Sequence, residues 1–223
     1  MKYELWPILL TLKLAVLTTA ILILIGIPLG YWLAYTKSRF RSLLETLVSM
    51  PLVLPPTVLG FYLLLFFSPG SLPGRLLESW FDLRIVFTFA GLVIGSVIFS
   101  LPFMVNPVKA GFQSLPASLS EAAYTLGKSR TETLLRVLLP NIKPSLLSAA
   151  VMTFAHTIGE FGVVLMIGGN IPGSTRVASI AIYGEVESLN YASANFYSLI
   201  LLAISFSVLF ALYIADKKTR IGF

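Results

Sequence analysis

Two ionisable residues stand four positions apart in a strongly apolar stretch of the chain, His156 and Glu160. On one α-helix this spacing places both side chains on the same face. A charge at the centre of a bilayer costs about 2.5 to 3.5 kcal/mol on insertion scales, so such residues usually face a bundle interior or a wet cavity. The pair could therefore shape a transport pathway or gate, or His156 could be a packed, hydrogen-bonded histidine.

We interpret Glu160 as a structural or gating residue that serine, threonine or histidine would hold by hydrogen bonds. Gly159 and Gly162 allow close approach of the backbone beside it. The chain has no cysteine and one histidine, which leaves neither a disulfide nor a ligand cluster for a catalytic metal.

A second candidate site is the polar segment LPASLSEAAYTLGKSRTETLLRVLLPNIKP. Ser118 and Glu121 have the spacing of a capping box, which predicts that a short helix begins there. Gly127 suits a left-handed helix end, and Thr131 could cap a second short helix that Pro140 ends. The segment therefore predicts two short helices joined at a glycine, which would form a compact knob.

The tripeptide Gly127-Lys128-Ser129 resembles the end of a phosphate-binding P-loop. That motif needs a glycine five residues before its Gly-Lys pair, whereas Ala122 stands there and no strand is predicted before it. No ATP site is therefore predicted in this chain, and any ATP would be hydrolysed by a partner.

The elements that must position these residues are predicted to be transmembrane helices. The chain is 57% hydrophobic and 12% charged, with a mean hydropathy of +0.88, whereas a soluble domain carries about a quarter charged residues. A span needs roughly 20 apolar residues. The sequence thus predicts an all-α, multi-pass membrane protein with one transmembrane domain over 1–223 and a longest internal loop at 107–144. Its five predicted spans are 14–35, 50–67, 86–106, 145–167 and 192–215.

The positions of lysine and arginine predict the orientation, because cytoplasmic loops are enriched in both. One side holds 11 of them and the opposite side five. We therefore expect the N-terminus outside the membrane, and the C-terminus and the loop 107–144 inside. The net charge of +6 then reflects contact with a lipid bilayer and not with nucleic acid. The inner set is Lys37, Arg39, Arg41, Lys109, Lys128, Arg130, Arg136, Lys143, Lys217, Lys218 and Arg220; the outer set is Lys2, Lys13, Arg75, Arg84 and Arg176.

Prolines and glycines mark irregular or tightly packed points in these spans. Three prolines in the run MPLVLPPTVLG interrupt the second span, which indicates either a pathway or a kinked packing helix. The GxxxG motifs that begin at Gly26 and Gly91 are typical of helix-packing faces.

The knob segment resembles the EAA loop of ABC importer permeases, with Val137 where isoleucine is commonest. In that family the knob docks into a cleft on a separate ATPase subunit, and closure of the ATPase dimer moves the membrane helices. Lys128, Arg130 and Arg136 could pair with that partner or simply reflect the positive inner face. The residues that carry the resemblance, and the coupling role it implies, are Glu121, Ala122, Ala123, Gly127, Leu139 and Pro140.

The strings GEFG (159–162) and GNIPG (169–173), with PLVLPPTVLGFYLLL, resemble the sulfate and molybdate permeases among these importers. The short length, the five-span plan and Ile182-Tyr183 are more similar to the molybdate branch. One departure is that the group often has arginine where His156 stands, and a histidine is charged only when protonated. The resemblance implies a homodimer in a prokaryotic cytoplasmic membrane, an ATPase dimer that holds ATP and magnesium, an external oxyanion-binding protein, and no cofactor in this chain.

Other functions stay open from the sequence. The nearest are the same machine with sulfate, thiosulfate or tungstate as cargo. A proton-coupled secondary transporter could use His156 and Glu160 as a relay, but that class more often shows internal repeats and several buried charges, which this sequence lacks. A membrane enzyme would need a nucleophile, a metal or an acid–base set, and none is predicted.

Overall fold

The computed structural model describes residues 4–221, and every regular element in that range is a helix. Lys2 lies outside the described residues, as do the side chains of Lys217, Lys218 and Arg220. The all-α prediction is confirmed. In chain order the elements are α1 (Trp6–Tyr35), α2 (Arg41–Ser49), η1 (Met50–Leu52), α3 (Pro56–Phe67), α4 (Leu72–Phe81), α5 (Phe89–Gln113), α6 (Ala117–Thr125), α7 (Arg130–Thr133), η2 (Leu134–Leu138), α8 (Leu139–Asn141), α9 (Lys143–Ile158), α10 (Gly162–Gly168), α11 (Ala178–Glu187) and α12 (Tyr191–Ile221).

Three of the described helices, α1, α5 and α12, are long and apolar enough to cross a membrane. Two further candidates are bent pairs: Arg41–Leu52 with Pro56–Phe67, at 111°, and Arg130–Asn141 with Lys143–Ile158, at 77°. If each bent pair counts as one span, the described part of the chain holds up to five.

Helix boundaries differ from the prediction where proline and glycine act. The predicted span 50–67 is not one straight helix, because prolines lack an N–H donor and the chain bends between η1 and α3. The predicted span 145–167 is divided between α9 and α10 at residues 159–161. The predicted span 86–106 corresponds to α5, which begins three residues later, at Phe89, and continues to Gln113, so that it takes in the first residues of the predicted loop.

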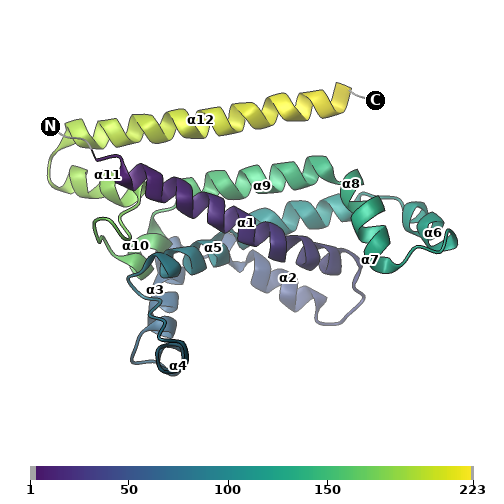
Figure 1. Ribbon diagram of the computed structural model, residues 1–223, viewed down its shortest axis with the longest axis horizontal. Coiled ribbons are helices and arrows are strands. Elements are labelled where there is room, and N and C mark those ends of the chain that lie inside the picture. Colours follow the sequence, from purple (N-terminus) through teal and green to yellow (C-terminus); the bar gives the residue numbers. More distant parts are fainter. Residues whose placement is uncertain (1–3, 222–223) are drawn as a thin grey trace.

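Helices α1, α5 and α9 run side by side and form the centre of the molecule (Figure 1). Glycines bring α1 and α5 together: a Cβ added at Gly30 would lie 2.8 Å from Cγ1 of Val108, and Gly26 faces Met104 as closely. Gly95 likewise faces Val163 of α10. The GxxxG motifs are therefore packing faces, as predicted.

The apolar core has two main parts, one at each end of the central helices. The knob-end core gathers around Phe112 of α5, Leu138 of η2 and Ile142 before α9. The opposite core gathers around Leu92 of α5 and Ile167 of α10. Figure 1 shows α6 to α8 at one end of the bundle, α3 and α4 projecting below the other end, and α12 along one edge.

Candidate functional site

The knob consists of α6, a turn at Gly127, and the helical segment from α7 to α8. Gly127 has φ +73°, with nothing near the position of a Cβ, so the predicted left-handed helix end is confirmed. The predicted capping box is wrong: α6 begins at Ala117, and its N-cap is Pro116, which offers no side-chain acceptor. Ser118 therefore lies inside the first turn and does not cap the helix.

The second half of the knob also differs in its ends. Ser129, not Thr131, caps α7, because its hydroxyl accepts a hydrogen bond from the Glu132 N–H at 3.2 Å. Pro140 does not end the helix: it occupies the first turn of α8, immediately after the π-helical turn η2, and a proline is tolerated in a first turn. The chain bends later, at Ile142, where α9 begins.

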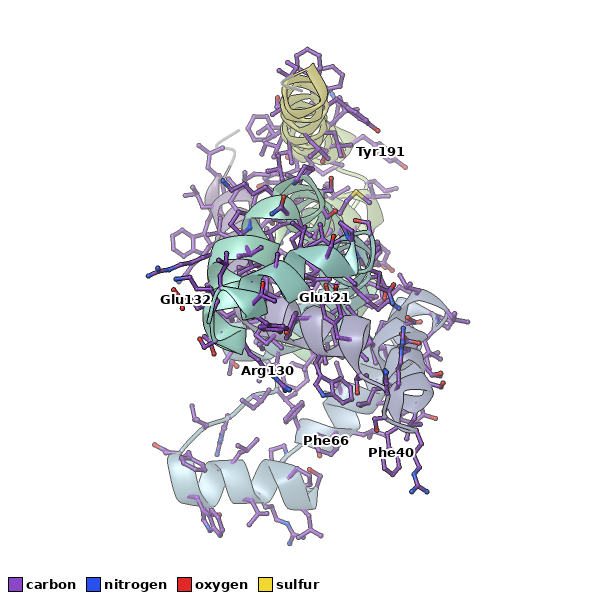
Figure 2. All side chains as sticks on the ribbon, turned by 90° about the vertical axis from the view of Figure 1, so that its right-hand side faces the viewer. Phe40, Phe66, Glu121, Arg130, Glu132 and Tyr191 are labelled. Carbon is purple, nitrogen blue, oxygen red and sulfur yellow. The ribbon has the colours of Figure 1, made fainter. Side chains whose placement is uncertain are left out.

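The coupling residues of the prediction divide between a packed face and an open face of the knob. Ala123 is buried, and Leu139 packs against the knob-end core. Glu121, Ala122 and Pro140 are exposed, and Figure 2, which looks onto this end of the molecule, shows Glu121 on the side facing the viewer. The surface around Glu121 and Ala122 is therefore free to meet another protein.

Leu126 is a residue that the sequence interpretation missed. It is 79% exposed, at the tip of the knob beside Gly127. Exposed leucines are common on a lipid-facing helix, but this one lies in a polar loop, where an apolar side chain more often marks a contact surface. The sequence feature that could have identified Leu126 is its position as an isolated leucine between Thr125 and Gly127.

The three basic residues of the knob do not act alike. Lys128 and Arg136 both form ion pairs with Glu132, at 2.7 and 3.1 Å. The hydrogen bond from Lys128 holds the pKa of the Glu132 carboxyl below its usual value. The side chain of Arg130 makes no hydrogen bond or ion pair with any residue that the structure describes, and it leaves the knob in a different direction from Glu132 (Figure 2).

Glu160 lies in the break between α9 and α10 and is 5% exposed. One carboxylate oxygen accepts a hydrogen bond from the Ser96 hydroxyl at 3.0 Å, and the other accepts one from the Val164 N–H at 3.2 Å. The Ser179 hydroxyl donates to the Glu160 carbonyl at 2.6 Å. The carboxylate therefore satisfies a free N–H in the first turn of α10 and ties that turn to α5.

His156 has a different environment from Glu160. Its Nδ1 lies 2.9 Å from the Ser100 hydroxyl, and its ring stacks on Phe103 with centroids 4.0 Å apart. The expected shared face does not form, because α9 ends at Ile158 and the chain changes direction before Glu160. Within the described residues the two side chains are not hydrogen-bonded to each other, and each meets its own serine on α5.

The two glycines beside Glu160 have unequal roles. A Cβ at Gly162 would lie 2.6 Å from Cβ of Pro56, so α10 and the start of α3 touch at this point. Gly159 has only its own helix carbonyls nearby, at 3.8 Å or more. Close backbone approach was expected at both, and the structure shows it at Gly162 alone.

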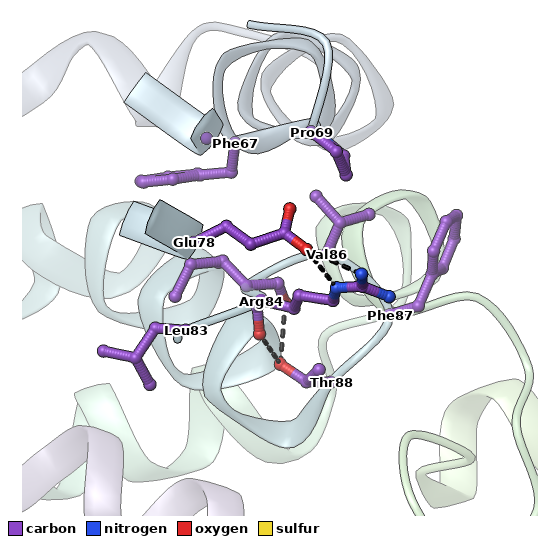
Figure 3. Close-up of a pocket in the computed structure, with 10 residues that line it drawn as sticks. Phe67, Pro69, Glu78, Leu83, Arg84, Val86, Phe87 and Thr88 are labelled. Carbon is purple, nitrogen blue, oxygen red and sulfur yellow. Dashed lines mark hydrogen bonds and ion pairs between the residues drawn. The ribbon is translucent and has the colours of Figure 1, made fainter. Parts of the chain in front are cut away.

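A cavity of about 360 Å³ lies between the end of α3, the helix α4 and the start of α5 (Figure 3). Its charged side chains, Glu78 and Arg84, form an ion pair at 2.6 Å. The Thr88 hydroxyl donates to the Ile85 carbonyl at 2.7 Å and caps α5. These polar groups satisfy one another, so the cavity is not a strong candidate for an anion site.

Comparison with known proteins places this geometry in context. Residues 26–221 match the family described as binding-protein-dependent transport system inner membrane component. The chain is 46% identical to the molybdenum transport system permease protein ModB of Azotobacter vinelandii over 221 residues, 99% of this chain and 97% of that relative. It is 33% identical to the sulfate transport system permease protein CysT of Escherichia coli over 189 residues, 84% of this chain and 67% of that relative.

The fold is similar to that of a solved membrane transporter. A chain in the crystal structure of a bacterial alginate ABC transporter, in complex with an alginate pentasaccharide-bound periplasmic protein, superposes with a TM-score of 0.78. The alignment covers 98% of this chain and 80% of that one, at 18% sequence identity, so it shows a common fold.

Proposed function

The chain belongs to the family of binding-protein-dependent transport system inner membrane components, and from this premise we propose that it is the permease that carries molybdate in an ATP-driven importer. The observation that supports this cargo is the similarity to a molybdenum permease over nearly the whole length of both chains. Sulfate, thiosulfate and tungstate are the alternative cargoes, because a sulfate permease is also similar to most of the chain.

In this proposal two copies of the chain form the pathway, two ATPase subunits bind the knobs, and an external binding protein delivers the oxyanion. ATP and Mg²⁺ bind to the ATPase subunits. The exposed face of α6 around Glu121 and Ala122, with Leu126 at its tip, would be the ATPase contact. The knob would lie in the cytoplasm, the N-terminus outside and the C-terminus inside the prokaryotic cytoplasmic membrane.

The packing of the knob suggests how movement would reach the membrane. Leu138 of the knob and Ile142, which follows it, pack with Phe112 of α5 in one core, so a shift of the knob moves helix ends with it. From Ile142 the chain continues along α9 to the break at Glu160. Alternating access would then consist of movement of α9 and α10 relative to α5, with hydrogen bonds to Ser96 and Ser100 as the contacts that change.

The test is transport by purified components in lipid vesicles. The chain is reconstituted with its ATPase and its binding protein, and uptake of labelled molybdate is measured with and without ATP, with sulfate and tungstate as competitors. ATP-dependent uptake that excess sulfate does not reduce would support both the machine and the cargo. Uptake that follows a proton gradient without ATP would contradict the proposal and favour a relay through His156 and Glu160.

A further inference from the structure

A second polar site lies at the knob end of the bundle, where α6 meets the last turns of α1. It is a pocket of about 240 Å³. Five of its six lining residues carry a hydrogen-bond donor, and none carries a carboxylate. The lining residues are Tyr31, Tyr35, Ser120, Tyr124, Arg130 and Leu138.

The aromatic wall of this pocket is held firmly by α5. The ring of Tyr31 packs edge-to-face on Tyr35 and on Phe112, with centroids 5.1 and 5.4 Å apart. The Tyr35 hydroxyl donates to the Phe112 carbonyl at 3.0 Å, so its proton is already used. Among the described residues the Tyr31 hydroxyl has no such backbone partner, and Tyr31 lines the pocket together with Tyr124 of α6 and with Arg130.

Arg130 is the unpaired cation at this pocket. Lys128 and Arg136 share Glu132, and Lys109 pairs with Glu45 at 3.1 Å. Within the described residues the Arg130 guanidinium has neither an ion pair nor a hydrogen bond. Such a guanidinium beside two phenol hydroxyls offers several N–H and O–H donors in one small space, and the described lining of the pocket carries no carboxylate that would repel an anion.

We propose that this pocket binds a tetrahedral oxyanion. Arg130 supplies the charge and two of the N–H donors, and the hydroxyls of Tyr31 and Tyr124 donate to further oxygens. Because Tyr31 belongs to α1 and Tyr124 to α6, a bound anion bridges a membrane-spanning helix and the coupling helix. The proposal rests on the proposed function in one respect: the pocket opens to the cytoplasm only if the knob lies there.

Two oxyanions of this chemistry would be present beside the knob of an importer. One is the transported cargo after release, and the other is the inorganic phosphate that ATP hydrolysis produces. Both are tetrahedral and accept hydrogen bonds on each oxygen, so the pocket geometry suits either, and binding measurements distinguish them.

The experiment is equilibrium binding to the purified full-length permease in lipid nanodiscs. Labelled molybdate, sulfate and phosphate are the probes, with chloride as the background ion. Saturable binding of one anion per chain is expected. Arg130→Gln should weaken binding by about tenfold or more, and Tyr124→Phe by about threefold to tenfold, since each removes donors to a charged ligand.

Lys128→Gln is the matched control, because it removes the same charge from the same loop but from a side chain paired with Glu132 outside the pocket. It should bind the anion as the unaltered chain does. Arg130→Lys, which keeps the charge but loses the planar fork, should lie between the unaltered chain and Arg130→Gln. Thermal unfolding of each variant checks that the fold is intact.

Tighter binding of molybdate than of phosphate would assign the site to the cargo, and the reverse order would assign it to phosphate; either supports the site. No saturable binding, or equal loss in Arg130→Gln and Lys128→Gln, would overturn it. Import is measured separately. Phosphate binding in a chain that imports no oxyanion would support the site and contradict the proposed function. Import by a chain that binds no anion at the pocket would support the proposed function and contradict the site.

Discussion

The knob and the polar cluster around Glu160 both place a carboxylate next to a helix break, but they treat it differently. In the knob, the Glu132 carboxylate lies near the surface, where it is open to water and forms ion pairs with two cations, Lys128 and Arg136. In the cluster, Glu160 is buried without a cation among its described contacts and is held by a serine and a backbone N–H. The buried carboxylate of Glu160 is therefore satisfied inside the protein, whereas the half-exposed carboxylate of Glu132 remains available to other molecules.

The largest expected effect is at Glu160. Glu160→Ala removes the acceptor of both Ser96 and the Val164 N–H, and an unsatisfied buried donor costs about 1 to 3 kcal/mol. Thermal unfolding of the variant in nanodiscs should therefore show a clear loss of stability. Glu160→Gln, which keeps one acceptor oxygen, should lose less; equal stability of the alanine variant and the unaltered chain would contradict a structural role for the carboxylate.

The two glycines beside Glu160 provide the next test. Gly162→Ala forces a methyl group against Pro56, and overpacking of this kind costs about 1 to 3 kcal/mol. Gly159→Ala meets open space and is the matched control. The unfolding temperature should fall for the first variant and change little for the second, and a reversed order would show that the contact between α10 and α3 is not tight.

In the knob the expected effect is on transport. Gly127→Val places a β-branched residue at φ +73°, where a left-handed conformation costs about 1 to 2 kcal/mol, and so should distort the turn and slow ATP-dependent uptake. Membrane insertion should stay normal. Gly127→Asn, which tolerates this conformation better, should keep most of the uptake; full uptake in the valine variant would contradict the coupling role of the turn.

The smallest effect is expected at Glu132. Glu132→Gln frees Lys128 and Arg136, so stability should barely change because the pairs are exposed. Binding of the ATPase should instead become more sensitive to salt, measured by co-purification over a salt series. The pKa of the Glu132 carboxyl is lowered in the folded chain, so the unaltered protein should lose the same ion pairs only as the pH falls through that lowered value. An unchanged salt response would show that these charges lie away from the ATPase contact.

The sequence by itself determined the features that depend on neighbouring residues. Long apolar blocks predict the membrane helices, because lipid requires backbone groups to pair within each helix. The left-handed turn at Gly127 followed from a single residue type that tolerates positive φ. Glycine spacing in α1 predicted a packing face, since residues four apart share one side of a helix.

Only the tertiary structure decided which polar groups meet. Ser96 and Glu160 are 64 residues apart, and their pairing depends on how α5 packs against the break after α9. Likewise, the sequence shows three cations in the knob, but two of them pair with Glu132, and the Arg130 side chain, beside Tyr31 and Tyr124, has no ion-pair partner among the described residues. Local preferences set each helix, whereas contacts between helices depend on the packing of the whole chain, which no short stretch of sequence contains.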